Sequence, residues 1–185
     1  MILLGLGSNL GDRKSNLDAA LKALGQGNDA PLQIQHVSSI YESAALLPEN
    51  APPEWDISYY NIVISAITTL KPEKLLQTIK RIEVELGRKD IGRWGPRIID
   101  IDILAYDDMI HESESLIIPH AEMLGRDFVM IPLAELHPHW HYPTAAKITT
   151  QTPLTAQQVV EQKAMTLGEG LKRLPLTLQW QQDNA

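Results

Sequence analysis

The chain has 185 residues, a formal net charge of −7 and no cysteine. This length suits one well-packed domain. The negative charge argues against a general nucleic-acid binder, which usually presents a basic surface. The lack of cysteine excludes disulfides and thiolate metal sites and fits a reducing compartment. Because no apolar run approaches membrane-spanning length, we expect a cytoplasmic protein that contacts neither a membrane nor nucleic acid.

The chain begins with an apolar run at residues 1–7, which predicts a strand, and a glycine-marked loop follows at 8–12. A helix comes next, because apolar residues repeat with helical spacing from Leu17 to Leu24 and glycines then end the pattern.

Two more strands are predicted at 32–41 and 60–69. Between them, residues 46–56 include three prolines and suit neither a helix nor a strand. We expect a long loop there, and long loops on compact domains often act as lids.

Pro72 is expected to open a second helix, whose apolar stripe runs from Leu75 to Leu86. A polar loop at 88–96 then leads to a strand around Asp100. In the C-terminal part, helices are predicted at 126–136 and near 155–167, and we expect residues 179–185 to be frayed.

This order of elements predicts an α+β sandwich in which helices cover one face of an antiparallel sheet. We expect residues 1–185 to form a single domain, with the C-terminal helices as additions to the sandwich.

The most informative motif is a pair of acids, Asp100 and Asp102, inside a β-branched run. Side chains alternate along a strand, so both carboxylates lie on one face, with Cα atoms about 7 Å apart, and Ile99, Ile101 and Ile103 lie on the other. This spacing allows two carboxylates to share hard cations. Because like charges on a half-buried face repel, a divalent ion or a basic side chain should lie opposite them.

The residues before this strand are Arg93, Trp94 and Arg97, with a Gly-Pro bend at 95–96 that can direct both arginines back towards the acids. A solvated polar strand face would also explain a lone pair of acids. Cations, an aromatic ring and a possible divalent-metal pair within ten residues instead outline a nucleotide-phosphate site.

Three other patterns are weaker. The glycines at 5–11 have the spacing GxGxxxG outside a βαβ series, so turn glycines explain them better than a dinucleotide site. No GxxxxGK[ST] phosphate loop occurs. The histidines at 137–141 lack a common zinc spacing, and we expect no zinc there.

Several segments together resemble, in order and spacing, the 6-hydroxymethyl-7,8-dihydropterin pyrophosphokinase family of folate biosynthesis; they are 5–11, 59–61, 93–104, 119–120 and 126–128. The likeness covers about residues 1–143 and leaves the role of 144–185 open. It implies a ferredoxin-like sandwich. It also implies a transferase that moves the β,γ-diphosphate of ATP to the hydroxymethyl oxygen of 6-hydroxymethyl-7,8-dihydropterin and releases AMP.

The resemblance also implies the site residues. Two Mg²⁺ ions would be held by Asp100 and Asp102. The catalytic residues would be Arg88, Arg97 and Asp102. ATP would bind Glu83, Arg88, Trp94, Arg97, Ile99, His120 and Arg126. The pterin would bind Ser43, Ala44, Leu46, Tyr59, Asn61 and Phe128, where Asn61 can offer a donor and an acceptor and Phe128 can stack on the ring.

The chain departs from the family pattern at several positions; these are Ser43-Ala44 for Thr-Pro, Lys80 for glutamine, Ser115 for arginine and Ala121 for an aromatic residue. Two other functions stay open. A metal-dependent nuclease or nucleotidyltransferase would need a third acid and a basic track. A catalytically silent nucleotide-binding module would have lost an arginine. We expect a monomer whose partners are ATP and the pterin.

Overall fold

The computed structural model describes residues 1–27, 29–89, 91–92, 94–143, 153–168 and 170–180. In chain order its elements are β1 (Ile2–Ser8), α1 (Arg13–Gly25), β2 (Gln33–Val37), β3 (Ile40–Ser43), η1 (Pro53–Trp55), β4 (Tyr59–Ile67), α2 (Pro72–Glu85), β5 (Asp100–Tyr106), β6 (His111–Glu112), β7 (Ile117–Ile118), η2 (Met123–Gly125), α3 (Asp127–Leu136), α4 (Ala156–Gln162) and β8 (Leu171–Leu174). None of the helices in these ranges combines the length and apolar character needed to cross a bilayer.

The main sheet has the strand order β5-β1-β4-β3-β8, and β2 also pairs with β4. The paired strands run antiparallel, as predicted. In the central strand β1, Gly7 lies opposite Asp100 of β5 on one side and Asn61 of β4 on the other. The glycine-rich strand therefore separates the predicted metal-binding acids from the predicted pterin-binding amide by one strand.

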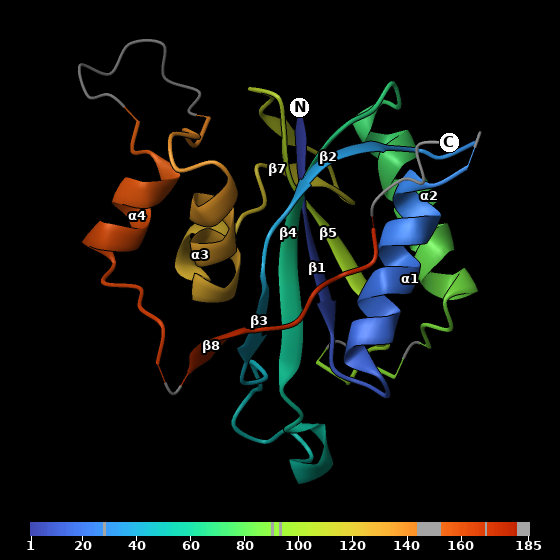
Figure 1. Ribbon diagram of the computed structural model, residues 1–185, viewed down its shortest axis with the longest axis vertical. Coiled ribbons are helices and arrows are strands. Elements are labelled where there is room, and N and C mark those ends of the chain that lie inside the picture. The colour runs from blue at the N-terminus through green and yellow to red at the C-terminus, as the bar shows by residue number, and fades with distance from the viewer. Residues whose placement is uncertain (28, 90, 93, 144–152, 169, 181–185) are drawn as a thin grey trace.

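Helices cover both faces of the sheet rather than the single face we predicted. Helices α1 and α2 pack on one face, and α3 packs on the other, with α4 against the outer side of α3 (Figure 1). Strand β1 shows why: Leu4 and Leu6 enter the core under α1 and α2, whereas Leu3 enters the core under α3. A strand buried on both faces gives a continuous apolar run, which is the pattern of residues 2–4.

The predicted strand at 32–41 is broken into β2 and β3, which lie end to end along β4. Ser38 bridges the break, because its backbone N–H donates to Val63 O at 2.9 Å and its Oγ accepts from Val63 N at 3.0 Å. The small hydroxyl therefore replaces a backbone group where the strand bulges.

The C-terminal part differs more from the prediction. Helix α4 has a capping box at Thr155 but ends at Gln162, and Ala164 follows with a positive φ of 50°. The short strand β8 on β3 was not predicted. Residues 179–180 are not frayed, because Gln179 N donates to Asp18 Oδ1 at 2.7 Å and Trp180 packs against the core under α1. Residues 181–185 lie outside the described ranges.

Candidate active site

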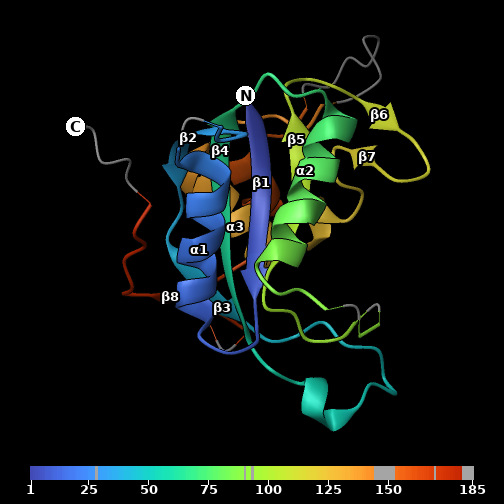
Figure 2. The same ribbon diagram turned by 90° about the vertical axis from the view of Figure 1, so that its right-hand side faces the viewer.

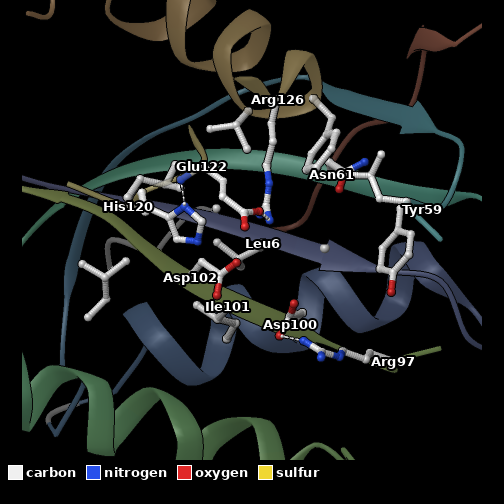
Figure 3. Close-up of a pocket in the computed structure, with 18 of the residues that line it drawn as sticks. Leu6, Tyr59, Asn61, Arg97, Asp100, Ile101, Asp102, His120, Glu122 and Arg126 are labelled. Carbon is white, nitrogen blue, oxygen red and sulfur yellow. Dashed lines mark hydrogen bonds and ion pairs between the residues drawn. The ribbon is translucent and has the colours of Figure 1, made fainter. Parts of the chain in front are cut away.

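A cavity of about 540 Å³ opens over β1, β4 and β5 and extends to the start of α3 (Figure 3). Twelve of the predicted site residues line it: Ser43, Ala44, Leu46, Tyr59, Asn61, Trp94, Arg97, Asp100, Asp102, His120, Arg126 and Phe128. The other three do not: Glu83, Arg88 and Ile99. Residues from both halves of the chain therefore meet in one cavity.

Strand β5 places its two acids as the alternation predicts. Asp100 and Asp102 point into the cavity (Figure 3). Ile99, Ile101 and Ile103 belong to the core under α1 and α2, although Ile101 and Ile103 also border the cavity. Ile99 does not line the cavity. Burial, followed by the charge of Asp100, raises the pKa of Asp102, while His120, Lys80 and Arg126 act in the opposite direction.

Two arginines supply the positive charge that we expected opposite the acids. Nη1 of Arg88 and Nη1 of Arg97 each lie 2.7 Å from Oδ1 of Asp100. Arg97 follows the Gly-Pro bend, so the bend does return this arginine to the strand. Arg93, the other arginine of this prediction, lies outside the described residues.

Glu83 is 1% exposed and does not line the cavity. Its Oε1 accepts from Ile101 N at 2.7 Å and from Lys80 Nζ at 3.0 Å, and its Oε2 lies 2.5 Å from Nη1 of Arg88. Burial raises the pKa of Glu83, and the charges of Lys80 and Arg88 act against that shift. Glu83 therefore fixes α2 to β5 and holds Arg88 against Asp100.

Asn61 lies in the part of the cavity where the pterin was predicted. Its Nδ2 donates to Ser43 Oγ at 3.0 Å and to Tyr41 O at 3.4 Å. A Cβ placed on Gly7 would lie 3.3 Å from Asn61 Oδ1. Both N–H groups of the amide therefore have protein partners, and the amide oxygen lies next to Gly7 at the cavity. We predicted that Asn61 offers a ligand both a donor and an acceptor, whereas in the structure its N–H groups are already used and the acceptor remains.

The glycines of the 5–11 motif do not all serve a turn, as we had interpreted them. Gly5 and Gly7 lie within β1 and line the cavity, whereas Gly11, with a φ of 63°, is a turn glycine. A side chain at Gly7 would press on Asn61 and Tyr59. Alternation within the strand Gly5-Leu6-Gly7 was the signal that these two glycines share a face.

Two further acids line the cavity, Glu114 and Glu122, and no sequence pattern indicated either of them. Glu122 has partners at the site. Its backbone N–H donates to Nδ1 of His120 at 3.2 Å, and its carboxylate pairs with Arg126 (Figure 3). The guanidinium of Arg126 also lies 5.8 Å from the centre of the Phe128 ring. Glu122 therefore holds two of the predicted ATP-binding residues, His120 and Arg126, on one wall.

The donor set of the acid pair fits Mg²⁺. Hard carboxylate oxygens suit this ion, which usually binds one or two protein carboxylates and completes its octahedron with water and phosphate oxygens. Within the described ranges no group of three or more His, Cys, Asp or Glu is placed to hold a metal by itself. Two carboxylates facing an open cavity match an ion that a phosphate ligand helps to bind.

Residues 3–138 match the family model of 7,8-dihydro-6-hydroxymethylpterin-pyrophosphokinase. The chain belongs to this family. Two relatives named 2-amino-4-hydroxy-6-hydroxymethyldihydropteridine pyrophosphokinase are each 41% identical over 146 residues. The match with the Aquifex aeolicus protein covers 79% of this chain and 86% of the relative, and the match with the Haemophilus influenzae protein covers 79% and 87%.

A folate synthesis bifunctional protein from Chlamydia muridarum is 38% identical over 176 residues, which is 89% of this chain. This chain spans only 38% of the length of that relative. In the crystal structure of Plasmodium falciparum HPPK-DHPS wild type with SDX-DHP, a similar fold covers 93% of this chain and 47% of that chain, with a TM-score of 0.61 and 18% identity. This likeness confirms the predicted ferredoxin-like α+β fold.

Membership of the pyrophosphokinase family accounts for β1 to α3. Helix α4 and strand β8 follow the part of the chain that the family model matches. The Chlamydia match covers 89% of the chain, so it includes residues beyond 138. Part of the C-terminal segment is therefore shared with a bifunctional relative.

Proposed function

We propose that this protein transfers the β,γ-diphosphate of ATP to the hydroxymethyl oxygen of 6-hydroxymethyl-7,8-dihydropterin, in folate biosynthesis, and releases AMP. The observation that carries the proposal is that one cavity contains the acid pair Asp100 and Asp102, the guanidinium of Arg97, and the Asn61 and Phe128 side chains. The family to which the chain belongs, and the names of its relatives, support this reading.

The two ends of the cavity suit the two substrates. Asn61 Oδ1 can accept from the donor edge of a pterin, and the Phe128 ring offers a flat apolar face for stacking. Towards β5, the guanidinium of Arg97, which lies beside Asp100, offers positive charge to a triphosphate. A hydroxymethyl group between them would lie near Asp102, which is therefore our candidate for orienting the attacking oxygen.

We assign Asp100 and Asp102 to a Mg²⁺ pair. When bound there, Mg²⁺ would supply positive charge that neutralises the triphosphate. Arg88 and Arg97 then stabilise the charge that develops on the transferring group, because a guanidinium can donate two parallel hydrogen bonds to phosphoryl oxygens. Glu83 positions Arg88, so we now assign it an indirect role in ATP binding.

The alternatives are less well supported. Glu114 and Glu122 also line the cavity, but the Glu122 carboxylate pairs with Arg126. A nuclease would add a third acid to the metal ligands, and within the described ranges no group of three such residues is placed to hold a metal. A catalytically silent module would lack an arginine, and here Arg88 and Arg97 both lie at Asp100. The monomeric state and the cytoplasmic location stay predictions.

The test is incubation with ATP, Mg²⁺ and the pterin, followed by identification of the products by mass. We expect AMP and the pterin diphosphate in equal amounts. ADP with a pterin monophosphate would reject diphosphate transfer. Cleavage of an oligonucleotide under the same conditions would support the nuclease alternative.

A further inference from the structure

Asn9 is a buried polar residue that the site described above does not use. It follows β1 directly and is 2% exposed. Its side-chain Oδ1 accepts from Arg97 N at 2.6 Å, and its own backbone N–H donates to Arg97 O at 3.0 Å. One residue therefore binds both backbone polar groups of Arg97.

The other end of the same amide reaches a different segment. Asn9 Nδ2 donates to Ile57 O at 3.1 Å. Ile57 comes two residues before Tyr59, the first residue of β4 and a predicted pterin contact. Asn9 thus joins the end of the polar loop at 88–96, through Arg97, to the end of the long loop at 46–56, through Ile57. Both loops extend from the same end of the molecule (Figure 2).

The two loops also approach each other away from Asn9. A Cβ placed on Gly92 would lie 3.6 Å from Cη2 of Trp55, an ordinary contact distance. Trp55 belongs to η1 in the long loop at 46–56, and Gly92 belongs to the polar loop at 88–96. The two loops therefore lie close together at this point, and Asn9 is the buried side chain that links their ends.

Only asparagine supplies what this position needs. The planar amide carries an acceptor at one end and a donor at the other, at the reach of one methylene. Aspartate keeps the acceptor for Arg97 N but loses the donor to Ile57 O. Alanine loses both and leaves the Arg97 N–H without this partner in a buried place.

We propose that Asn9 is a positioning residue for the transfer reaction. It fixes the backbone of Arg97 so that the guanidinium reaches the transferred diphosphate, and it holds Ile57, at the end of the 46–56 loop, in place next to Tyr59. This inference rests on the proposed function. The guanidinium of Arg97 is directed by a backbone that Asn9 holds at two points, and its head lies 2.7 Å from Asp100. A displacement of about 1 Å at such a group can reduce a rate on the order of 10²-fold.

The first experiment compares Asn9→Ala with Asn9→Asp. For Asn9→Ala we expect kcat to fall on the order of 10²-fold, with the dissociation constant of a non-hydrolysable ATP analogue changed less than about threefold. Asn9→Asp should keep most of kcat, because the acceptor for Arg97 N is retained, and should raise KM for the pterin. If the two substitutions change kcat and KM equally, then the acceptor for Arg97 N and the donor to Ile57 O do not have the separate roles proposed here.

Asn16→Ala is the matched control. Its amide donates to Ser8 Oγ at 3.1 Å and to Leu10 O at 2.7 Å, so it supports the same turn without contacting Arg97 or Ile57. We expect Asn16→Ala to lower thermal stability and leave kcat within about twofold of the starting value. A kcat loss in Asn16→Ala as large as in Asn9→Ala would assign the effect to the turn as a whole.

A double-mutant cycle tests whether Asn9 acts through Arg97. If it does, adding Asn9→Ala to Arg97→Ala should change kcat by no more than about twofold, because the group being positioned is already gone. Losses that multiply would overturn the proposal.

Hydrogen exchange separates this inference from the proposed function. The Arg97 amide should exchange faster in Asn9→Ala than in the unsubstituted protein and keep its protection in Asn9→Asp. This readout needs no turnover, so it decides the positioning role even if the pterin is not a substrate. Equal protection of the Arg97 amide in all three proteins would contradict the proposal.

Discussion

Arg88 and Arg97 donate to the same oxygen of Asp100, each over 2.7 Å. The two guanidinium groups therefore neutralise one acid of the pair, while Asp102 faces the cavity from the same strand face. Mg²⁺ also prefers a carboxylate oxygen. We expect ligand binding to exchange arginine contacts at Asp100 for contacts with phosphate, which delivers both arginines to the transferring group.

The first prediction concerns these arginines. Arg97→Ala and Arg88→Ala should each lower kcat on the order of 10²-fold or more, because they act on charge that develops in the transition state. Dissociation constants for an ATP analogue and the pterin, measured by calorimetry, should change much less. Arg81→Ala, on the exposed face of α2, is the control. Parallel losses in binding and turnover would make Arg88 and Arg97 simple phosphate anchors.

The second prediction concerns Asp102. Asp102→Ala should abolish most turnover and most of the Mg²⁺ dependence of ATP binding, and excess Mg²⁺ should restore little because a ligand of the ion is missing. Calorimetric titration of ATP with and without Mg²⁺ measures this. Asp108→Ala removes an exposed acid beyond the end of β5 and should behave like the unsubstituted protein. Near-normal activity of Asp102→Ala would refute the metal assignment.

The third prediction uses the glycines of β1. In Gly7→Ala the new Cβ would lie 3.3 Å from Asn61 Oδ1 and 3.4 Å from a Tyr59 ring carbon. We expect pterin affinity to fall about tenfold, since crowding of this kind costs about 1–3 kcal/mol, and ATP affinity to change little.

Gly5→Ala is the control for the glycine prediction, because the atoms nearest to its Cβ would belong to Leu104, at an ordinary 3.5 Å. Fluorescence titration with the pterin compares the two variants. If Gly5→Ala weakens pterin binding as much as Gly7→Ala, the space above Gly7 is not part of the pterin site.

The fourth prediction concerns stability and pH. Burial, followed by the charge of His36, lowers the pKa of His137 below its usual 6.5. The two rings pack edge to face with centroids 5.6 Å apart. Because the unfolded state binds the proton more readily, the contribution of His137 to stability is complete above pH 6.5 and decreases as the pH falls below it.

Urea unfolding between pH 5 and 7.5 measures this dependence. The stability lost on acidification should be smaller in His137→Gln than in the unsubstituted protein. His139→Gln, from the same histidine cluster, should leave the dependence unchanged. An identical pH dependence in His137→Gln would contradict the assignment.

The sequence predicted the elements whose local pattern is strong. The Asp100 strand and the helix after Pro72 are confirmed because alternation and helical periodicity act within one segment. We did not predict that α3 covers the second face of the sheet. The unbroken apolar run at 2–4 indicates such coverage, because a strand buried on both faces has apolar residues at successive positions. Strand β8, at four residues, is too short for a pattern to identify.

The partners of the site residues were harder to predict than the residues themselves. Asn9 and Arg97 are 88 positions apart, and no local pattern links them. The buried ion pair of Glu83 with Arg88 depends on where α2 ends relative to β5. Such contacts are products of the tertiary fold, so they appear only once the strands are placed side by side.

The most direct test of the account follows labelled phosphorus from ATP in the presence of Mg²⁺ and 6-hydroxymethyl-7,8-dihydropterin. With label in the β-phosphate, we expect all transferred label to appear on the pterin, and with label in the α-phosphate we expect the label to stay in AMP. Transfer of γ-label alone, with β-label left in ADP, would contradict diphosphate transfer, and α-label on the pterin would indicate a nucleotidyltransferase.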